Sequence, residues 1–164
     1  VGVADINSTR RDLMKNLYGI APEHCFGDWK EVFNLPKFAD AVIIATPDNL
    51  HYDPCMVALA AGYDVLLEKP IAQTEKECKN ILKQAKKYGR IVGVCHVLRY
   101  SPYFRALKRV LDEGRVGDVL SIQHLEPIRF HHFAHSYVRG NWQSAKQTTP
   151  LILAKACHDL DIVR

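Results

Sequence analysis

The sequence predicts an α/β fold built on a doubly wound parallel sheet, and three features of the chain support this prediction. Short apolar runs without polar alternation recur between residues 1 and 95, as expected for strands that are buried on both faces. Segments with helical spacing of apolar residues separate these runs. The turns between them are short, so strand and helix alternate as in right-handed βαβ units.

Most of the expected helices have a start or a stop signal. Asn7 or Ser8 is expected to cap the first helix, and Gly19 to end it in a left-handed conformation. Thr74 and Glu77 form a capping-box pattern at the start of a later helix. The predicted strands are residues 1–5, 41–46, 65–67 and 91–95, and the predicted helices lie between 8 and 19, near 30–35, from about 53 to 61 and between 74 and 89.

The pattern changes near residue 98, where we place a domain boundary. Ser101 and Pro102 begin a helix that is expected to end near Glu113, because proline is tolerated at the first helical position. Residues 118–125 then alternate apolar and polar, which predicts a half-exposed strand of an antiparallel sheet. The remaining predictions are a long connection over 129–149 and an apolar helix over 150–164.

The composition excludes several classes of protein. Of the 164 residues, 48% are hydrophobic and 24% are charged, which is ordinary for a globular protein. The net charge of +4 is modest and the basic residues are spread along the chain, so no nucleic-acid partner is indicated. No apolar run is long enough for a membrane span, and the five cysteines lack the spacing of a disulfide framework or a zinc site. We therefore expect a cytoplasmic protein. Because the chain starts without methionine in a strand-like run, we also expect a preceding segment.

One predicted strand ends abruptly in charged residues. The apolar run 65–67 is followed by Glu68, Lys69 and Pro70. Proline ends strand pairing because it has no N–H group to donate. Glu68 and Lys69 therefore lie at the carboxyl end of a central parallel strand, where open α/β sheets bind their ligands. From composition alone, the simpler interpretation of Lys69 is a solvated charge that closes a strand.

Six short motifs follow one another along the chain. They are AVIIATPDNLH at 41–51, DVLLEKP at 64–70, RYSP at 99–102, EGRVGDVLSI at 113–122, GNW at 140–142 and KACHDLD at 155–161. Taken together and in this order, the motifs resemble those of the Gfo/Idh/MocA oxidoreductases, which are NAD(P)-dependent enzymes that act mostly on sugars and cyclitols. The resemblance extends from Ala41 to Asp161.

The resemblance implies two domains, both incomplete. Residues 1–97 would form a Rossmann-like dinucleotide-binding domain, and residues 98–164 the start of an α+β domain with an open antiparallel sheet. The family's first strand and its glycine-rich phosphate loop have no counterpart here, since residues 1–5 match the second strand. We therefore expect residues 1–5 and 41–46 to lack the strand that lies between them. The family also implies a homo-oligomer that forms through the carboxyl-terminal sheet.

The resemblance further implies hydride transfer between a nicotinamide cofactor and a carbinol carbon of a polyol or sugar. The expected cofactor is NAD, with NADP as the alternative. A regulatory protein that senses NAD(P) or a sugar on the same fold is the other candidate function. The intact Glu-Lys-Pro motif, together with His158, favours the enzyme.

Three residues are predicted to be catalytic: Lys69, His158 and Lys155. Lys69 matches the substrate lysine of the family and His158 its late histidine. A cation beside a hydroxyl oxygen stabilises the negative charge that develops as the proton leaves. Lys155 and His158 are three positions apart on a predicted helix, so the ammonium would lower the pKa of His158. Ala154 stands where family members often carry an aspartate.

The resemblance also implies a set of cofactor contacts. Asp5 ends its strand where dinucleotide sites bind the adenosine ribose, which favours NAD because a carboxylate repels a 2′-phosphate. Trp142 resembles a residue near the nicotinamide, and core packing is the equal alternative. His131, His132 and His135 lack further ligands, so no metal is expected. The predicted cofactor-binding residues are Asp5, Thr46, Pro47, Asn49, His51, Glu68, Lys69 and Trp142.

Overall fold

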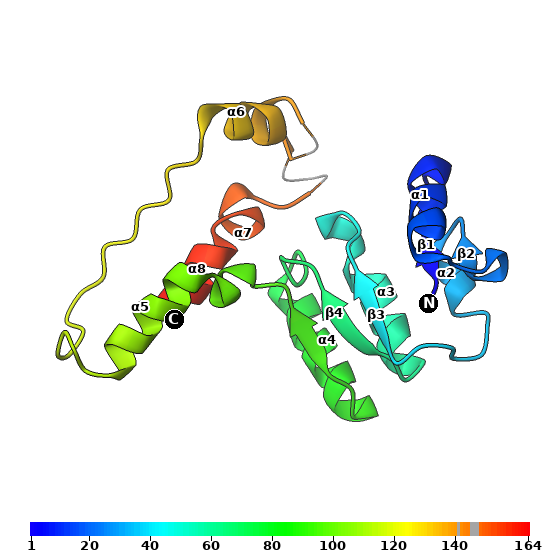
Figure 1. The fold of residues 1–164 in the computed structure, drawn as a ribbon, viewed down its shortest axis with the longest axis horizontal. Coiled ribbons are helices and arrows are strands. Elements are labelled where there is room, and N and C mark those ends of the chain that lie inside the picture. Colours follow the sequence, from blue (N-terminus) through cyan, green and yellow to red (C-terminus); the bar gives the residue numbers. More distant parts are fainter. Residues whose placement is uncertain (141, 145–147) are drawn as a thin grey trace.

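The computed structural model describes residues 1–140, 142–144 and 148–164 (Figure 1). The strands are β1 (Val3–Ala4), β2 (Cys25–Phe26), β3 (Ala41–Ile44), β4 (Asp64–Leu67) and β5 (Val92–Val94). The α-helices are α1 (Ser8–Tyr18), α2 (Trp29–Val32), α3 (Tyr52–Ala60), α4 (Glu75–Tyr88), α5 (Pro102–Asp112), α6 (Phe130–Phe133), α7 (Leu151–Ala154) and α8 (Cys157–Val163). Among these residues, the 3₁₀ helices are η1 (Pro22–His24), η2 (Asp48–Leu50) and η3 (Val97–Tyr100), and η4 (Ala134–Val138) is a π-helix.

The strands in the described part of the chain pair in parallel, as predicted, but they form two sheets. β1 pairs with β2, and β3, β4 and β5 follow one another in the second sheet. β2 was not predicted, because its two residues are too few to give a strand pattern. No ladder joins β1 to β3 among the described residues.

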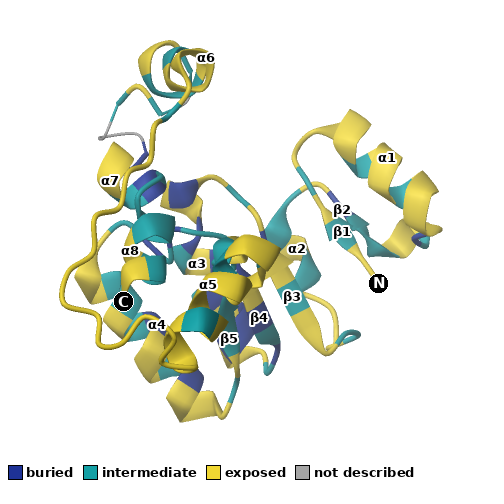
Figure 2. Ribbon diagram, turned by 60° about the vertical axis from the view of Figure 1, so that its left-hand side comes forward, coloured by how far each residue is buried: buried dark blue, intermediate teal, exposed yellow. Residues whose placement is uncertain are grey.

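The hydrophobic core lies between the second sheet and the helices α3 and α4. Ile44, Val65 and Leu67 pack against these helices, and the side chain of Leu67 has no exposed surface. Figure 2 shows buried residues, in dark blue, along β4. Neighbouring strand residues are uncovered, since Ile43 is 71% and Leu66 is 41% exposed. The prediction of strands buried on both faces is therefore wrong for the described residues, because only one side of β3 and β4 is covered.

The predicted helix signals act as expected in α1 and α4. The side chain of Asn7 accepts the backbone N–H of Arg10 and caps α1, and Gly19 ends that helix with φ of 59°. The hydroxyl of Thr74 accepts the N–H of Glu77, whose carboxylate accepts the N–H of Thr74 in return. This complete capping box begins α4. Local sequence therefore determines where these two helices start.

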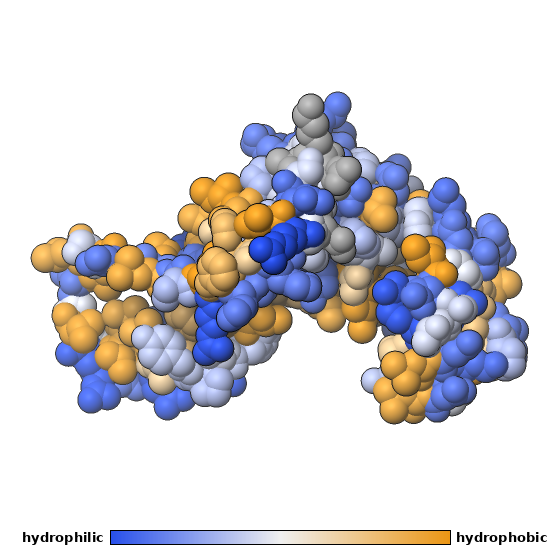
Figure 3. All heavy atoms as spheres, turned by 90° about the horizontal axis from the view of Figure 1, so that it is seen from above, coloured by the Kyte–Doolittle hydropathy of each residue, from blue (hydrophilic) through white to orange (hydrophobic). Residues whose placement is uncertain are grey.

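The antiparallel strand predicted at 118–125 is not formed. Residues 119–129 run without regular secondary structure from α5 to α6 (Figure 1). A strand needs a neighbour to pair its N–H and C=O groups, and none of the described strands lies beside this segment. Its apolar side chains are exposed, with Leu120 at 94% and Leu125 at 76%, and Figure 3 shows apolar residues gathered at this end of the molecule.

The apolar helix predicted over 150–164 is interrupted. α7 ends at Ala154 and α8 begins at Cys157, with Lys155 and Ala156 between them. The apolar spacing is continuous across this point, so the sequence pattern gave no sign of the break. Backbone C=O groups near the end of α7 can therefore accept hydrogen bonds from other parts of the protein.

The helices in the described ranges are short. The longest is α4, with 14 residues, and none has the length and apolar character that crossing a membrane requires. The connection predicted over 129–149 contains α6 and η4. Asn141 of the GNW motif lies outside the described residues.

Candidate active site

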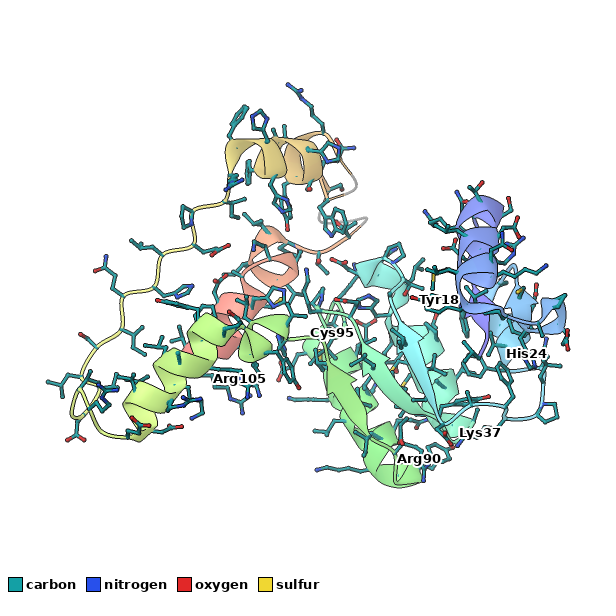
Figure 4. The ribbon with its side chains drawn as sticks, viewed as in Figure 1. Tyr18, His24, Lys37, Arg90, Cys95 and Arg105 are labelled. Carbon is teal, nitrogen blue, oxygen red and sulfur yellow. The ribbon has the colours of Figure 1, made fainter. Side chains whose placement is uncertain are left out.

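Three polar segments lie together at the carboxyl ends of β3, β4 and β5. They are residues 46–51, residues 68–70, and Cys95 with His96. The three strands are paired in register, so these segments share one edge of the sheet. Figure 4 shows Cys95 at this edge, between the sheet and the helices that follow. This is the position at which open parallel sheets bind their ligands.

The ammonium group of Lys69 joins the sheet to the carboxyl-terminal helices. Its Nζ donates to the backbone oxygen of Ala154 at 2.8 Å. In a continuous helix this oxygen would accept the N–H of His158. That N–H instead lies 3.4 Å from the oxygen of Lys155. The break between α7 and α8 therefore leaves the Ala154 oxygen available to Lys69.

The imidazole of His158 lies in an environment that favours its neutral form. Burial lowers its pKa, and the positive charges of Lys69, His96 and Lys155 act in the same direction. Its Nδ1 atom is buried and has no hydrogen-bond partner among the described residues. Lys69 and His158 are therefore close enough to interact electrostatically, although they come from distant parts of the chain. A neutral imidazole is the form that accepts a proton.

His96 belongs to the same cluster, and the sequence analysis missed it. Its ring lies edge-on to that of His158, with centroids 6.0 Å apart. Its Nε2 is 4.0 Å from Oδ1 of Asp161, which accepts a bidentate pair of hydrogen bonds from Arg99 at 2.6 Å. The Arg99 guanidinium lowers the pKa of Asp161. The signal that could have identified His96 is its position directly after a parallel strand, as for Lys69.

Lys155 lies differently from the prediction. It follows the end of α7, whereas His158 belongs to α8, so the shared helical face predicted for the pair is wrong. Its Nζ is 2.9 Å from Oε1 of Glu126. Close by, Nε2 of His124 is 2.7 Å from Oδ1 of Asp159. These two contacts hold the segment 119–129 against the region of α7 and α8.

On the cofactor side, the carboxylate of Asp5 is bound by an arginine of α1. Nε and Nη2 of Arg10 donate to its two oxygens at 2.8 and 2.9 Å, and this pairing lowers the pKa of Asp5. Nη1 of Arg11 donates to the backbone oxygen of Asp5 at 2.7 Å. The Asp5 side chain is 27% exposed. It can therefore still accept ribose hydroxyls, while two cations lie beside it.

The turn after β3 is anchored by Asp48, which the sequence analysis did not single out. Asp48 is buried, and its Oδ2 accepts the indole N–H of Trp142 at 3.0 Å and the hydroxyl of Thr149 at 2.5 Å. These contacts hold Trp142 against the turn that carries the predicted cofactor residues. Turn residues are commonly exposed, so a buried aspartate here could only be recognised from the tertiary contacts.

The predicted cofactor residues in this turn differ in exposure. Pro47 and Asn49 are exposed, and Thr46 is half-buried, with its hydroxyl donating within the turn at 3.0 Å. His51 is only 1% exposed. Its Nδ1 is 2.7 Å from the oxygen of Pro70, and its Nε2 is 2.8 Å from the oxygen of Thr46. This burial argues against direct contact between His51 and a cofactor.

Glu68 shapes the turn that presents Lys69. Its N–H donates to the oxygen of Ile44 at 2.9 Å, and its carboxylate accepts the N–H of Lys69 at 3.2 Å. Burial raises the pKa of the neighbouring Cys95 thiol, and the charge of Glu68 adds to this effect. The backbone of Glu68 therefore continues the pairing of β4 with β3 by one residue, and Lys69 follows directly after it.

The loop histidines His131, His132 and His135 are exposed on α6 and η4. A different group of potential ligands lies together in the described part of the chain. The ligand atoms of His124, Glu126 and Asp159 are within 4.8 Å of one another. Each of these three residues has a polar partner within the protein: His124 contacts Asp159, and Glu126 pairs with Lys155, which accounts for their proximity.

Comparisons with known proteins agree with this fold. Residues 1–96 match the model of a family described as an oxidoreductase family with an NAD-binding Rossmann fold. An inositol 2-dehydrogenase from Klebsiella pneumoniae is 30% identical over 166 residues, which covers 100% of this chain and 45% of that protein. The inositol 2-dehydrogenase 2 of Saccharopolyspora erythraea is 32% identical over 126 residues, which covers 76% of this chain and 34% of that protein.

Solved structures of inositol dehydrogenases also superpose on this chain. The myo-inositol 2-dehydrogenase of Lactobacillus plantarum superposes with a TM-score of 0.82 at 21% identity, over 100% of this chain and 47% of that chain. An inositol dehydrogenase homologue from Azotobacter vinelandii, solved with NADH and myo-inositol, has a TM-score of 0.63 at 27% identity, over 70% of this chain and 31% of that chain. The chain therefore spans less than half the length of these relatives.

Proposed function

The chain belongs to the Gfo/Idh/MocA family of NAD-binding oxidoreductases, and from this premise we propose that the protein is a dehydrogenase of sugar-like or cyclitol-like polyols. The bound nicotinamide cofactor would accept or supply the hydride at a carbinol carbon. The proposal rests on one observation. The ammonium of Lys69 binds the Ala154 oxygen at the break between α7 and α8, and it lies close enough to His158 to lower the pKa of that residue.

In this proposal Lys69 orients the substrate hydroxyl and stabilises its developing negative charge. An ammonium has three N–H groups, and the contact with Ala154 uses one of them. The other two can reach a hydroxyl oxygen from a fixed position. A donor held before the reaction requires no rearrangement when charge develops, which is the basis of electrostatic catalysis.

His158 would accept the hydroxyl proton during oxidation and return it during reduction. Burial and the neighbouring cations lower the pKa of His158, so its ring is neutral and can accept the substrate proton. Lys155 contributes to this field, but its ammonium is held by Glu126. We therefore propose Lys69 and His158 as the reacting pair and Lys155 as an electrostatic contributor.

The residues present fit an NAD-type cofactor. Asp5 supplies a partly exposed carboxylate at the end of β1, where ribose hydroxyls are bound in such folds. Thr46, Pro47 and Asn49 would line the cofactor along the edge of the second sheet, with Glu68 and Trp142 beside them. We propose NAD as the preferred cofactor because of Asp5. Arg10 and Arg11 are the residues that would favour NADP once Asp5 is removed.

The substrate class is inferred from the relatives. Inositol 2-dehydrogenases recur among them, and a 1,5-anhydro-D-fructose reductase from Ensifer adhaerens is 31% identical over 130 residues. We propose a ring-shaped polyol or sugar with neighbouring hydroxyl groups. Such a substrate can accept several N–H donors at once, which suits the two N–H groups of Lys69 that the contact with Ala154 does not use.

The test is a dehydrogenase assay on the full-length protein. NADH formation would be followed with a panel of inositols and pyranose sugars, comparing wild type with Lys69→Met and with the exposed-lysine control Lys83→Met. We expect turnover with at least one polyol, its loss in Lys69→Met and its retention in Lys83→Met. Equal turnover in both variants would refute the role of Lys69.

We further propose the division into residues 1–97 and 98–164, and assembly into a homo-oligomer through the second part. The exposed apolar side chains of residues 119–125 support this assembly. Light scattering on the full-length protein, with Leu120→Ser as the variant, measures the oligomeric state. A monomeric wild-type protein would contradict the assembly.

A further inference from the structure

Within the described part of the chain, the two hydrogen-bonding partners of His51 are both backbone oxygens. Its ring lies between the turn after β3 and the turn after β4, and is 1% exposed. Nδ1 is 2.7 Å from the oxygen of Pro70, and Nε2 is 2.8 Å from the oxygen of Thr46. Both distances are typical of hydrogen bonds in which a ring N–H donates to a carbonyl.

A neutral imidazole cannot make both bonds. It has one N–H donor and one lone-pair acceptor, whereas a carbonyl oxygen only accepts. In the neutral ring one nitrogen lone pair would therefore face a carbonyl lone pair at hydrogen-bond distance, with no room for water between them. A ring with protons on both nitrogens satisfies both carbonyls with charge-assisted bonds.

A second observation concerns charge balance. Asp48 lies in the same turn, three residues before His51, and it is also buried. Its carboxylate is bound by the neutral groups of Trp142 and Thr149, and no cation pairs with it among the described residues. Asp48 and His51 are both buried in one short segment, so a positively charged His51 would bring the net charge of that segment closer to zero.

We propose that His51 is a doubly protonated positioning residue that clamps the Glu68-Lys69-Pro70 turn to the turn after β3. The bond to Pro70 fixes the residue that follows Lys69, and the bond to Thr46 fixes the start of the proposed cofactor turn. The clamp thus sets the distance between the lysine and the cofactor. This positioning role rests on the function proposed above, whereas the protonation of the ring does not.

The protonation state is tested by nuclear magnetic resonance on the full chain labelled with 15N-histidine, at neutral pH. His51 is assigned through correlations between its ring and backbone nuclei in wild-type protein labelled with 13C and 15N, so the assignment needs no variant. We expect two ring nitrogens with similar chemical shifts, each correlated with its own proton. One protonated and one unprotonated nitrogen, with widely separated shifts, would overturn the proposal whether or not the protein proves to be an enzyme.

The positioning role is tested by two amide variants of the full-length protein. In His51→Asn the amide nitrogen occupies the place of Nδ1 and keeps the bond to Pro70. In His51→Gln the amide nitrogen reaches the place of Nε2 and keeps the bond to Thr46. Because a misplacement of about 1 Å can cost up to about 100-fold in rate, we expect kcat to fall at least about tenfold in His51→Gln and much less in His51→Asn.

The control is His131→Asn, which changes an exposed histidine on α6 and should leave kcat within about twofold of wild type. Circular dichroism confirms that each variant is folded. Equal losses of kcat in the two His51 variants, or no loss in either, would overturn the positioning role. If both variants fail to fold, the resonance measurement on the wild-type ring still decides the protonation.

Discussion

Replacing Lys69 by methionine tests the proposed chemistry most directly. Methionine keeps much of the length and the apolar stem of lysine but removes the ammonium. Removing one hydrogen-bond donor from a developing oxyanion typically costs about 2.7–4 kcal/mol of transition-state stabilisation, or about 10²–10³ in kcat. We expect a fall of this size for Lys69→Met, with the Kd for NAD nearly unchanged because the loss is confined to the reacting oxygen.

The same change has a smaller and separate effect on stability. The bond from Nζ to the oxygen of Ala154, 2.8 Å long, is lost, and a hydrogen bond with a charged donor contributes about 1.5–3 kcal/mol to the free energy of unfolding. Steady-state kinetics, NAD titration by calorimetry and urea unfolding separate the three quantities. A kcat for Lys69→Met within a few-fold of wild type would refute the catalytic role.

Three further predictions concern other parts of the protein. Asp5→Ser should raise the ratio of kcat/KM with NADP to that with NAD, because it removes a repulsive carboxylate between two arginines; an unchanged ratio would assign cofactor choice to another residue. Since burial and its cationic neighbours lower the pKa of His158, the neutral, active form should persist below the ordinary histidine range, and the rate of oxidation should fall only as pH drops through that lowered pKa. Lys155→Met should move this acid limb to higher pH in a pH–rate profile, and an unmoved limb would contradict the assignment to His158. Leu67→Ala should lower the free energy of unfolding by about 3–5 kcal/mol in urea because Leu67 is fully buried, while Leu82→Ala, at a 56% exposed position, should cost less than about 1 kcal/mol; similar costs would mean that the core has been misplaced.

Predictions from local sequence succeeded where the interactions are local. The capping box at Thr74 and Glu77 and the glycine that ends α1 are read from neighbouring residues, and the structure has them as predicted. The position of Lys69 at the end of β4 follows from the apolar run and the proline after it. These features depend on backbone geometry within a few residues, which is the information that a sequence pattern contains.

The remaining features depend on contacts between distant residues. Asp48 is buried where Trp142 and Thr149, about a hundred residues further along the chain, bind its carboxylate. His96 joins the site because α8 carries His158 to it. The alternation in residues 118–125 predicts a strand correctly only where another strand is beside it, and none of the described strands is.

The break between α7 and α8 links these observations to the proposed chemistry. In an uninterrupted helix over 150–164 the Ala154 oxygen would accept the N–H of His158, and Lys69 would have to share that oxygen with the helix. With the break, that oxygen accepts the ammonium at 2.8 Å, and Lys69 is fixed beside the imidazole whose pKa it lowers. Residue 154 is alanine, so its side chain offers no carboxylate to the ammonium. Its backbone oxygen is neutral, and therefore holds the lysine in place without cancelling the positive charge that acts on His158 and on a substrate hydroxyl.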